Sequence, residues 1–263
     1  MSTPGRKRKR AVRINVLGWL VAVSLTGLWQ VAVGLKWIDY SSVPDPSQII
    51  RAAGGLIKSG ELQSNISHTL LITVISALLA ALIGTITGVL MGLIPMVRAY
   101  LTGSIDFMRT IPVVGLFAVV VLIWDTSASA EVAVATYAAT WVIVLDTLAG
   151  VHAVRPLQWD VAKMLHLSRT TTIRKIVLPA AMPMILIGYR LAVVTALVVA
   201  ITAEMLVNAQ GIGWGLIKES QALQPAKMWV YVVVSGVLGY LVNLVLVRLV
   251  RLALPGASVV GSK

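Results

Sequence analysis

Three ionisable side chains lie within or near the ends of long apolar stretches of the sequence: Asp146, Arg190 and Glu204. An ionised group inside a bilayer is costly unless it is paired, hydrated or at the interface. Such residues therefore form either a structural contact between helices or part of a pathway. Asp146 and Glu204 could relay protons or cations, and Arg190 could attract an anion. The residues alone leave both interpretations open.

Other kinds of chemistry have less support in the sequence. The chain has no Cys, and its three His residues lack partners at ligand spacing, so we predict no metal site and no thiol nucleophile. No Gly-x-x-x-x-Gly-Lys-Ser/Thr loop occurs, so we expect the chain neither to bind nor to hydrolyse ATP. The sequence therefore predicts no enzyme and no cofactor bound by this chain.

The composition indicates a membrane protein. Hydrophobic residues make up 58% of the 263 residues and charged residues only 12%, whereas a soluble domain has about 25% charged residues. The mean hydropathy is +0.89. The net charge of +12 lies in the loops between apolar runs, which is typical of membrane topology and not of nucleic-acid binding.

The apolar runs predict an all-α, polytopic protein with about six transmembrane helices, because each run has about the 20 residues that cross a bilayer. We expect one transmembrane domain over residues 14–254, after a basic cytoplasmic N-terminus (1–13) and before a cytoplasmic tail (255–263). The expected spans are Ile14–Leu35, Ile66–Leu93, Ile105–Trp124, Val132–Val151, Pro183–Leu206 and Trp229–Val250.

The distribution of Lys and Arg predicts the orientation. Sixteen of them fall in the expected cytoplasmic segments, five in the outer segments, and Arg190 lies inside a span. The positive-inside rule then places both termini in the cytoplasm. The first apolar run is too long for a signal peptide and is not followed by a clear cleavage site, so we expect it to be retained.

The connection over residues 155–179 is longer than a simple hairpin needs and must have structure of its own. Asp160 suits the first turn of a short helix, where a negative charge is favoured. We expect this helix to end near Leu165. Its apolar face is formed by residues that recur at helical spacing: Val161, Met164, Leu165 and Ser168.

A second short helix should follow in the same loop. Ser168 is a good N-cap for a helix through Ile173, and Pro179 and Pro183 should end that helix and redirect the chain into the membrane. Two short helices would then expose apolar residues to the cytosol. Exposed apolar surface of this kind usually marks a protein docking site.

This loop resembles the signature of the membrane permeases of ABC importers, the binding-protein-dependent transport inner-membrane family. That signature is Glu-Ala-Ala, three residues, Gly, nine residues and Ile-x-Leu-Pro. The chain has Asp160-Val161-Ala162, His166 and Ile176-Val177-Leu178-Pro179 at the same spacing. The nitrate, sulfonate and taurine branch is resembled further by Arg109-Thr110-Ile111-Pro112, Leu178–Pro183, Gly188–Leu191, Ala203-Glu204 and Gly211-Ile212-Gly213.

Two residues depart from the family signature. His166 replaces Gly at a helix stop where positive φ is needed, and His is among the residues that tolerate this conformation when Gly is absent. Asp160 replaces Glu, keeping the negative charge on a shorter side chain. We expect docking to survive, with pairing to the ATPase that is particular to this chain.

The resemblance implies a permease subunit of an ATP-driven importer in a bacterial or archaeal cytoplasmic membrane. Its implied partners are ABC ATPase subunits carrying ATP and Mg, a second permease copy or paralogue, and an extracytoplasmic substrate-binding protein. The cargo would be a small solute such as a sulfonate, a nitrate-like ion or another small organic anion. The implied ATPase-docking residues are Asp160, Val161, Ala162, Lys163, Met164, Leu165, His166, Ser168 and Arg169. The pathway or gate candidates are Arg109, Pro112, Asp146, Arg190, Glu204, Gly211 and Gly213.

Two other classes remain open on the sequence. A secondary transporter or channel would use Asp146 and Glu204 as an ion relay. A membrane scaffold would give the ionisable residues no task. The chain shows no obvious internal repeat, and a secondary carrier would not need the docking signature in the longest cytoplasmic loop, so the importer is favoured.

Overall fold

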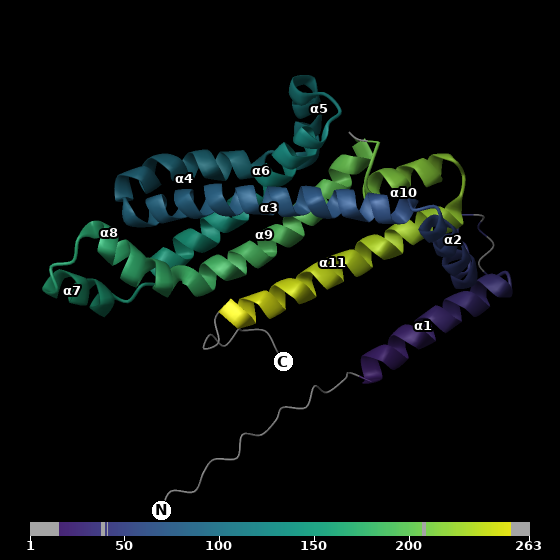
Figure 1. The fold of residues 1–263 in the computed structure, drawn as a ribbon, viewed down its shortest axis with the longest axis horizontal. Helices are drawn as coiled ribbons and strands as arrows, with labels where there is room; N and C mark the ends of the chain where they lie inside the picture. The colour runs from purple at the N-terminus through teal and green to yellow at the C-terminus, as the bar shows by residue number, and fades with distance from the viewer. Residues whose placement is uncertain (1–15, 38–39, 41, 207–208, 254–263) are drawn as a thin grey trace, which may run out of the picture.

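The computed structural model describes residues 16–37, 40, 42–206 and 209–253, all of whose regular elements are helices (Figure 1). The sequence predictions for residues 1–13 and 255–263 therefore lie outside the described residues. The helices, in chain order, are α1 (Val16–Gly34), α2 (Pro46–Lys58), α3 (Glu61–Leu93), α4 (Pro95–Thr110), α5 (Val113–Trp124), α6 (Ala128–His152), α7 (Pro156–Met164), α8 (Arg169–Thr172), a π-helical turn η1 (Ile173–Val177), α9 (Leu178–Leu206), α10 (Ile212–Gln221) and α11 (Pro225–Ala253).

Fewer helices than expected are long and apolar enough to cross a membrane. Within the described residues there are four: α3, α6, the continuous helix Arg169–Leu206 and α11. The bent pair α4 and α5 would make a fifth span, and α1 contributes a shorter apolar segment, Val23–Gly34. The all-α membrane fold is confirmed, whereas the expected count of about six spans differs from the four or five found here.

The expected third span, Ile105–Trp124, is wrong as a single helix. The chain bends by 91° between α4 and α5. The bend lies at Ile111, which is extended with φ −63° and ψ 123° and precedes Pro112, the N-cap of α5. The proline ring disfavours the α conformation in the residue before it, so an apolar run that looks continuous is broken at this point.

The core consists of α3, α6 and α9, which pack along most of their length (Figure 1). Three glycines of α3 make the approach to α6 possible. A Cβ on Gly84 would lie 2.8 Å from the Ile143 Cβ, and one on Gly88 would lie 2.6 Å from the Thr147 Cβ. One on Gly92 would lie 2.6 Å from a Val151 methyl group. The glycines at four-residue spacing therefore form a helix-packing stripe.

The end of the two-helix loop differs from expectation. Pro179 and Pro183 do not end a helix, because the helix is continuous from Arg169 to Leu206. The π turn η1 comes directly before Pro179, and the Leu178 N–H donates to the Ile173 carbonyl across the wider turn. Proline has no N–H to donate to the preceding turn. The π turn changes which carbonyl each N–H reaches directly before Pro179, and the helix continues past both prolines.

Candidate functional site

The first helix of the loop, α7, begins one turn earlier than expected. Pro156 occupies its first position, where a missing N–H costs nothing, and Arg155 is the N-cap. Asp160 consequently lies inside the helix and not in its first turn. Its Oδ1 atom is 3.8 Å from the Lys163 Nζ atom, and both side chains are exposed.

A Schellman motif ends α7 at the expected position. The Leu167 N–H donates to the Ala162 carbonyl and the His166 N–H to the Lys163 carbonyl, each at 3.0 Å. His166 adopts a φ of +49°, the left-handed conformation that favours glycine. The structure therefore confirms that His166 serves as the helix stop.

The next helix starts as the sequence predicted. The Ser168 hydroxyl accepts a hydrogen bond from the Thr171 N–H and caps α8. Arg169 is the first residue of this helix and is exposed. Because α8, η1 and α9 are continuous, this cap fixes the start of a helix that runs through the core.

The tip of the loop, defined here as Leu157, Val161, Met164 and Leu165, is apolar and exposed. The exposed fractions of Met164 and Leu165 are 79% and 64%. Ala162, predicted to dock, is buried instead. Behind the tip, Trp159 packs on a core cluster of Val151, Val154, Val177, Ala181 and Ile185. The loop is thus anchored through Trp159 on one side and leaves Met164 and Leu165 exposed on the other.

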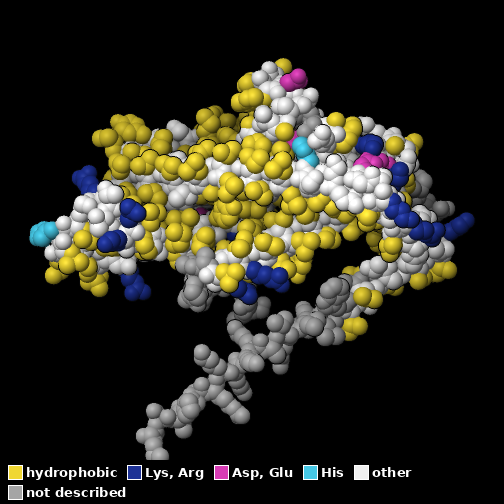
Figure 2. All heavy atoms as spheres, in the orientation of Figure 1, with side chains coloured by type: hydrophobic (Ala, Val, Ile, Leu, Met, Phe, Trp, Pro, Cys, Tyr) yellow, Lys and Arg dark blue, Asp and Glu magenta, His cyan; other side chains and the backbone are white. Residues whose placement is uncertain are grey.

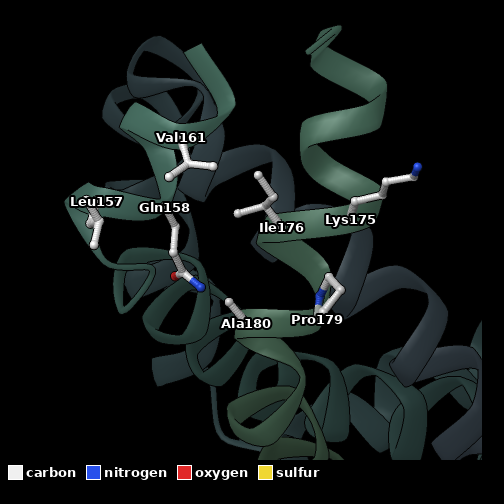
Figure 3. Close-up of a pocket in the computed structure, with 7 residues that line it drawn as sticks. All are labelled: Leu157, Gln158, Val161, Lys175, Ile176, Pro179 and Ala180. Atoms are coloured by element: carbon white, nitrogen blue, oxygen red, sulfur yellow. The ribbon is translucent and has the colours of Figure 1, made fainter. Parts of the chain in front are cut away.

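A groove of about 440 Å³ separates α7 from the start of α9. Figure 3 shows Val161 and Ile176 facing one another across it, while the Lys175 side chain extends away. Its remaining lining residues are Leu157, Gln158, Pro179 and Ala180. Figure 2 shows Lys and Arg side chains at this end, below the centre and at the opposite end of the molecule, and hydrophobic side chains covering the flanks of the long helices.

A buried polar cluster lies at the opposite end of the core. Nε2 of His68 (α3) is 3.0 Å from Oε2 of Glu131 (α6), and both acids, Glu131 and Glu204 (α9), are fully buried. Glu204 Oε2 accepts a hydrogen bond from the Gly213 N–H at 2.9 Å. Glu204 is among the pathway candidates named from the sequence, and the structure brings His68 and Glu131 to it. Glu131 is not among the sequence candidates. The sequence signal for it is its position directly before the expected span Val132–Val151.

The turn before α10 is built against this cluster. Gly211 has φ +99°, and a Cβ there would lie 2.1 Å from the Glu204 Cδ atom. A Cβ on Gly213 would lie 2.0 Å from the Ile201 carbonyl oxygen. The Gly211 N–H donates to Asn65 Oδ1, and Asn65 Nδ2 donates to the Tyr231 hydroxyl. These glycines allow the chain to close over buried polar groups. Asn65 and Tyr231 carry no local sequence signal, because they lie on different helices and meet only in the fold.

Asp146 and Arg190 lie away from the cluster. Asp146 is packed against Gly188, where a Cβ would lie 2.7 Å from the Asp146 Cβ, and its Oδ2 atom is buried without a hydrogen bond in the described structure. The Arg190 Nε donates a hydrogen bond to Asn243 Oδ1 at 2.9 Å, which joins α9 to α11. Arg190 also lines a groove of about 930 Å³ between α9 and α11.

Comparison with known proteins decides the family. The family described as binding-protein-dependent transport system inner membrane component matches residues 80–258. The chain belongs to this family. It is a transport permease.

Relatives of the permease lie in the branch that the sequence resembles. It is 28% identical over 240 residues to the putative aliphatic sulfonates transport permease protein SsuC of Bacillus subtilis, covering 91% of this chain and 86% of that protein. It is 23% identical over 263 residues to the nitrate import permease protein NrtB of Leptolyngbya laminosa, covering 92% and 93%. A chain in a solved structure of the inward-facing MetNI methionine ABC transporter has a TM-score of 0.67 at 19% identity, over 74% of the permease and 96% of that chain, and so shares its fold.

Family membership makes the chain an inner-membrane transport subunit that works with an ATPase and a substrate-binding protein.

Among the remaining site candidates, Arg109 and Pro112 flank the bend between α4 and α5. Arg109 Nε lies 3.4 Å from Asp106 Oδ1 on the exposed side of α4. The site candidates of the permease therefore divide into four separate places: the loop tip, the α4–α5 bend, the α9–α11 groove with nearby Asp146, and the buried cluster.

Proposed function

We propose that this permease forms the membrane pathway of an importer for a small anion of the sulfonate or nitrate class, and that the tip of α7 is its contact with the ATPase. The observation that carries the docking proposal is the exposed apolar tip on an anchored loop. Two of its side chains, Met164 and Leu165, leave most of their surface in water. A membrane-external apolar patch of this kind gains stability by burial in a partner.

The basic residues around the loop tip favour a position on the cytoplasmic side of the membrane, where the ATPase would bind. Lys163, Arg169, Arg174 and Lys175 are exposed on the loop. They would place basic residues on the cytoplasmic side, in agreement with the positive-inside rule. The α7 end of the core is opposite the end that carries α2 and α10 (Figure 1). The α2 and α10 end would then face the binding protein, and the C-terminal end of α11 would face the cytoplasm.

The anionic cargo is proposed from two observations. The relatives are transport permeases whose names specify sulfonates and nitrate. The α9–α11 groove contains Arg190, held by Asn243 and surrounded mainly by apolar residues. A guanidinium in such a setting attracts an anion more strongly than it would in water. We assign the groove to the pathway side of the permease.

The structure offers little for a secondary carrier. Asp146, on α6, packs against Gly188 of α9. Glu204 lies on α9, 16 positions after Gly188. At 1.5 Å per residue the two acids are about 24 Å apart along the axis. A direct relay between them would need intervening groups.

Reconstituted vesicles test the function. The permease, its ATPase and its binding protein are assembled in proteoliposomes, and uptake of radiolabelled taurine, an alkanesulfonate and nitrate is measured. We expect uptake of one anion that requires ATP and the binding protein and persists with an uncoupler. Uptake that follows a proton gradient without ATP would exclude the proposed function.

A further inference from the structure

The buried cluster has more negative charge than the structure neutralises. Glu131 and Glu204 have no exposed surface, and one oxygen of each, Oε1, accepts no hydrogen bond in the described structure. Removing an ionised carboxylate from water costs several kcal/mol unless a charge or hydrogen bonds compensate. Two buried carboxylates in one core therefore need either a bound cation or added protons to neutralise their charge.

The third member of the cluster supplies a different donor atom. The ligand atoms offered by His68, Glu131 and Glu204 all lie within 4.8 Å of one another. They come from three helices, α3, α6 and α9, so no spacing within a single segment could reveal them. The His68 side chain is 12% exposed and lies at the edge of the cluster, whereas the Glu131 side chain has no exposed surface.

We infer that His68, Glu131 and Glu204 form a binding site for one divalent cation of the zinc class. A nitrogen with two carboxylates matches the mixed donor sets of first-row divalent ions, whereas Mg²⁺ and Ca²⁺ prefer oxygen alone. An ion centred among three atoms at most 4.8 Å apart would be at most about 2.8 Å from each. Small side-chain rotations then reach the Zn²⁺ bond lengths of about 2.0–2.2 Å.

Charge and the surrounding hydrogen bonds support this assignment. A divalent ion neutralises both carboxylates at once, which a single protonated histidine does not. Glu204 is already oriented by the Gly213 N–H, and such outer contacts fix ligand geometry in metal sites. The present His68–Glu131 hydrogen bond would be replaced by the two bonds to the ion.

A cation here would have a defined structural effect. It would tie the outer ends of α3, α6 and α9 together and hold the Gly211 turn through Glu204. This role does not depend on which solute is carried. Failure of the metal experiment would therefore leave the proposed transport function intact.

Metal content and spectroscopy test the site on the full-length permease purified without a histidine tag. After exposure to Zn²⁺ and dialysis, we expect about one Zn²⁺ per chain by plasma mass spectrometry. Co²⁺ should give visible absorption bands of a low-coordinate site. Zn²⁺ should raise the Tm, and a chelator should reverse the rise.

Matched variants locate the ion. Glu131→Gln keeps the side-chain shape and should lower Zn²⁺ affinity at least tenfold, whereas His152→Gln, which alters an exposed histidine on the far end of α6, should not change it. A wild-type protein without bound Zn²⁺ or Co²⁺ bands, or equal affinity in Glu131→Gln, would overturn the proposal. A Tm that rises on acidification and ignores Zn²⁺ would show that the cluster holds protons instead. If Glu131→Gln does not fold, the wild-type stoichiometry and Co²⁺ spectrum still decide.

Discussion

Gly215 lies directly against the Tyr231 ring, and a Cβ at that glycine would be 2.3 Å from the ring Cζ atom. The ring is fully buried and its hydroxyl accepts a hydrogen bond from Asn65. This contact joins α10 to α11 beside the buried cluster. Neither partner can retreat easily, because the ring is rigid and enclosed.

Gly215→Ala should therefore destabilise the permease by about 1–3 kcal/mol, the usual cost of overpacking a core. The measurement is the Tm of the detergent-solubilised protein. Gly55→Ala is the control, because a Cβ at Gly55 has no neighbour within 4 Å. An unchanged Tm for Gly215→Ala would contradict the packing described here.

Gly88→Ala should separate α3 from α6. The added methyl would lie 2.6 Å from the Thr147 Cβ and 2.8 Å from the Val144 carbonyl oxygen, which is backbone. We expect a lower Tm by the same overpacking argument. Gly103→Ala in α4, where the methyl has open space, should be neutral or stabilising because alanine favours helices. Equal effects of the two substitutions would refute a specific role for Gly88.

Leu165→Asp should abolish association with the ATPase, because it puts a charge into the apolar tip. Co-purification of the ATPase with the permease measures this. Leu223→Asp is a matched control at the other end of the molecule, where Leu223 is 87% exposed. Retained association in the Leu165 variant would exclude the docking surface proposed for α7.

His166→Gly should preserve ATPase association, since glycine adopts the observed φ of +49° without strain. His166→Val should weaken it. The left-handed conformation costs ordinary residues about 1–2 kcal/mol, and a β-branched side chain tolerates it least. The ratio of ATPase to permease after purification distinguishes the two variants, and the same ratio for both would indicate that the helix stop is not critical.

The outer ion pair between Lys218 Nζ and Glu61 Oε1, 2.6 Å apart, should give a pH-dependent contribution to stability. The hydrogen bond that the Lys218 ammonium donates to Glu61 raises the pKa of Lys218 above its ordinary 10.5. A raised lysine pKa stabilises the fold below the ordinary pKa, and this contribution disappears as the pH rises through the folded-state pKa. Both side chains are about one-third exposed or more, so the effect is about 0.2–1 kcal/mol.

Glu61→Gln should therefore lower the Tm by a small, constant amount between pH 7 and about 9, and the difference from wild type should vanish at higher pH. Added salt should reduce it. A Tm difference that grows with pH would contradict the assigned direction.

Local sequence signals predicted the two-helix loop well. His166 as the helix stop and Ser168 as the N-cap are set by residues within one turn, and both are confirmed. The helix α7 begins one turn before the predicted start, because Pro156 occupies its first position, where proline is favoured. Hydropathy also found the long helices, but it cannot detect the bend at Pro112, where composition stays apolar on both sides.

The buried cluster could not be predicted because its members meet only in three dimensions. Glu131 precedes the expected span Val132–Val151 by one residue, so its position suggests a charge at the membrane surface. Its partner His68 is 63 positions away on another helix.

The uninterrupted helix from Arg169 to Leu206 has 38 residues and is about 57 Å long. One end carries the Ser168 cap beside the docking tip, and the other carries Glu204. The two ends of the permease are thus mounted on a single stiff rod. If the ATPase binds the loop tip as proposed, a force that it applies would reach the buried cluster as a tilt of that rod, and η1 and Pro183 are the interruptions of regular α-helical hydrogen bonding along the way.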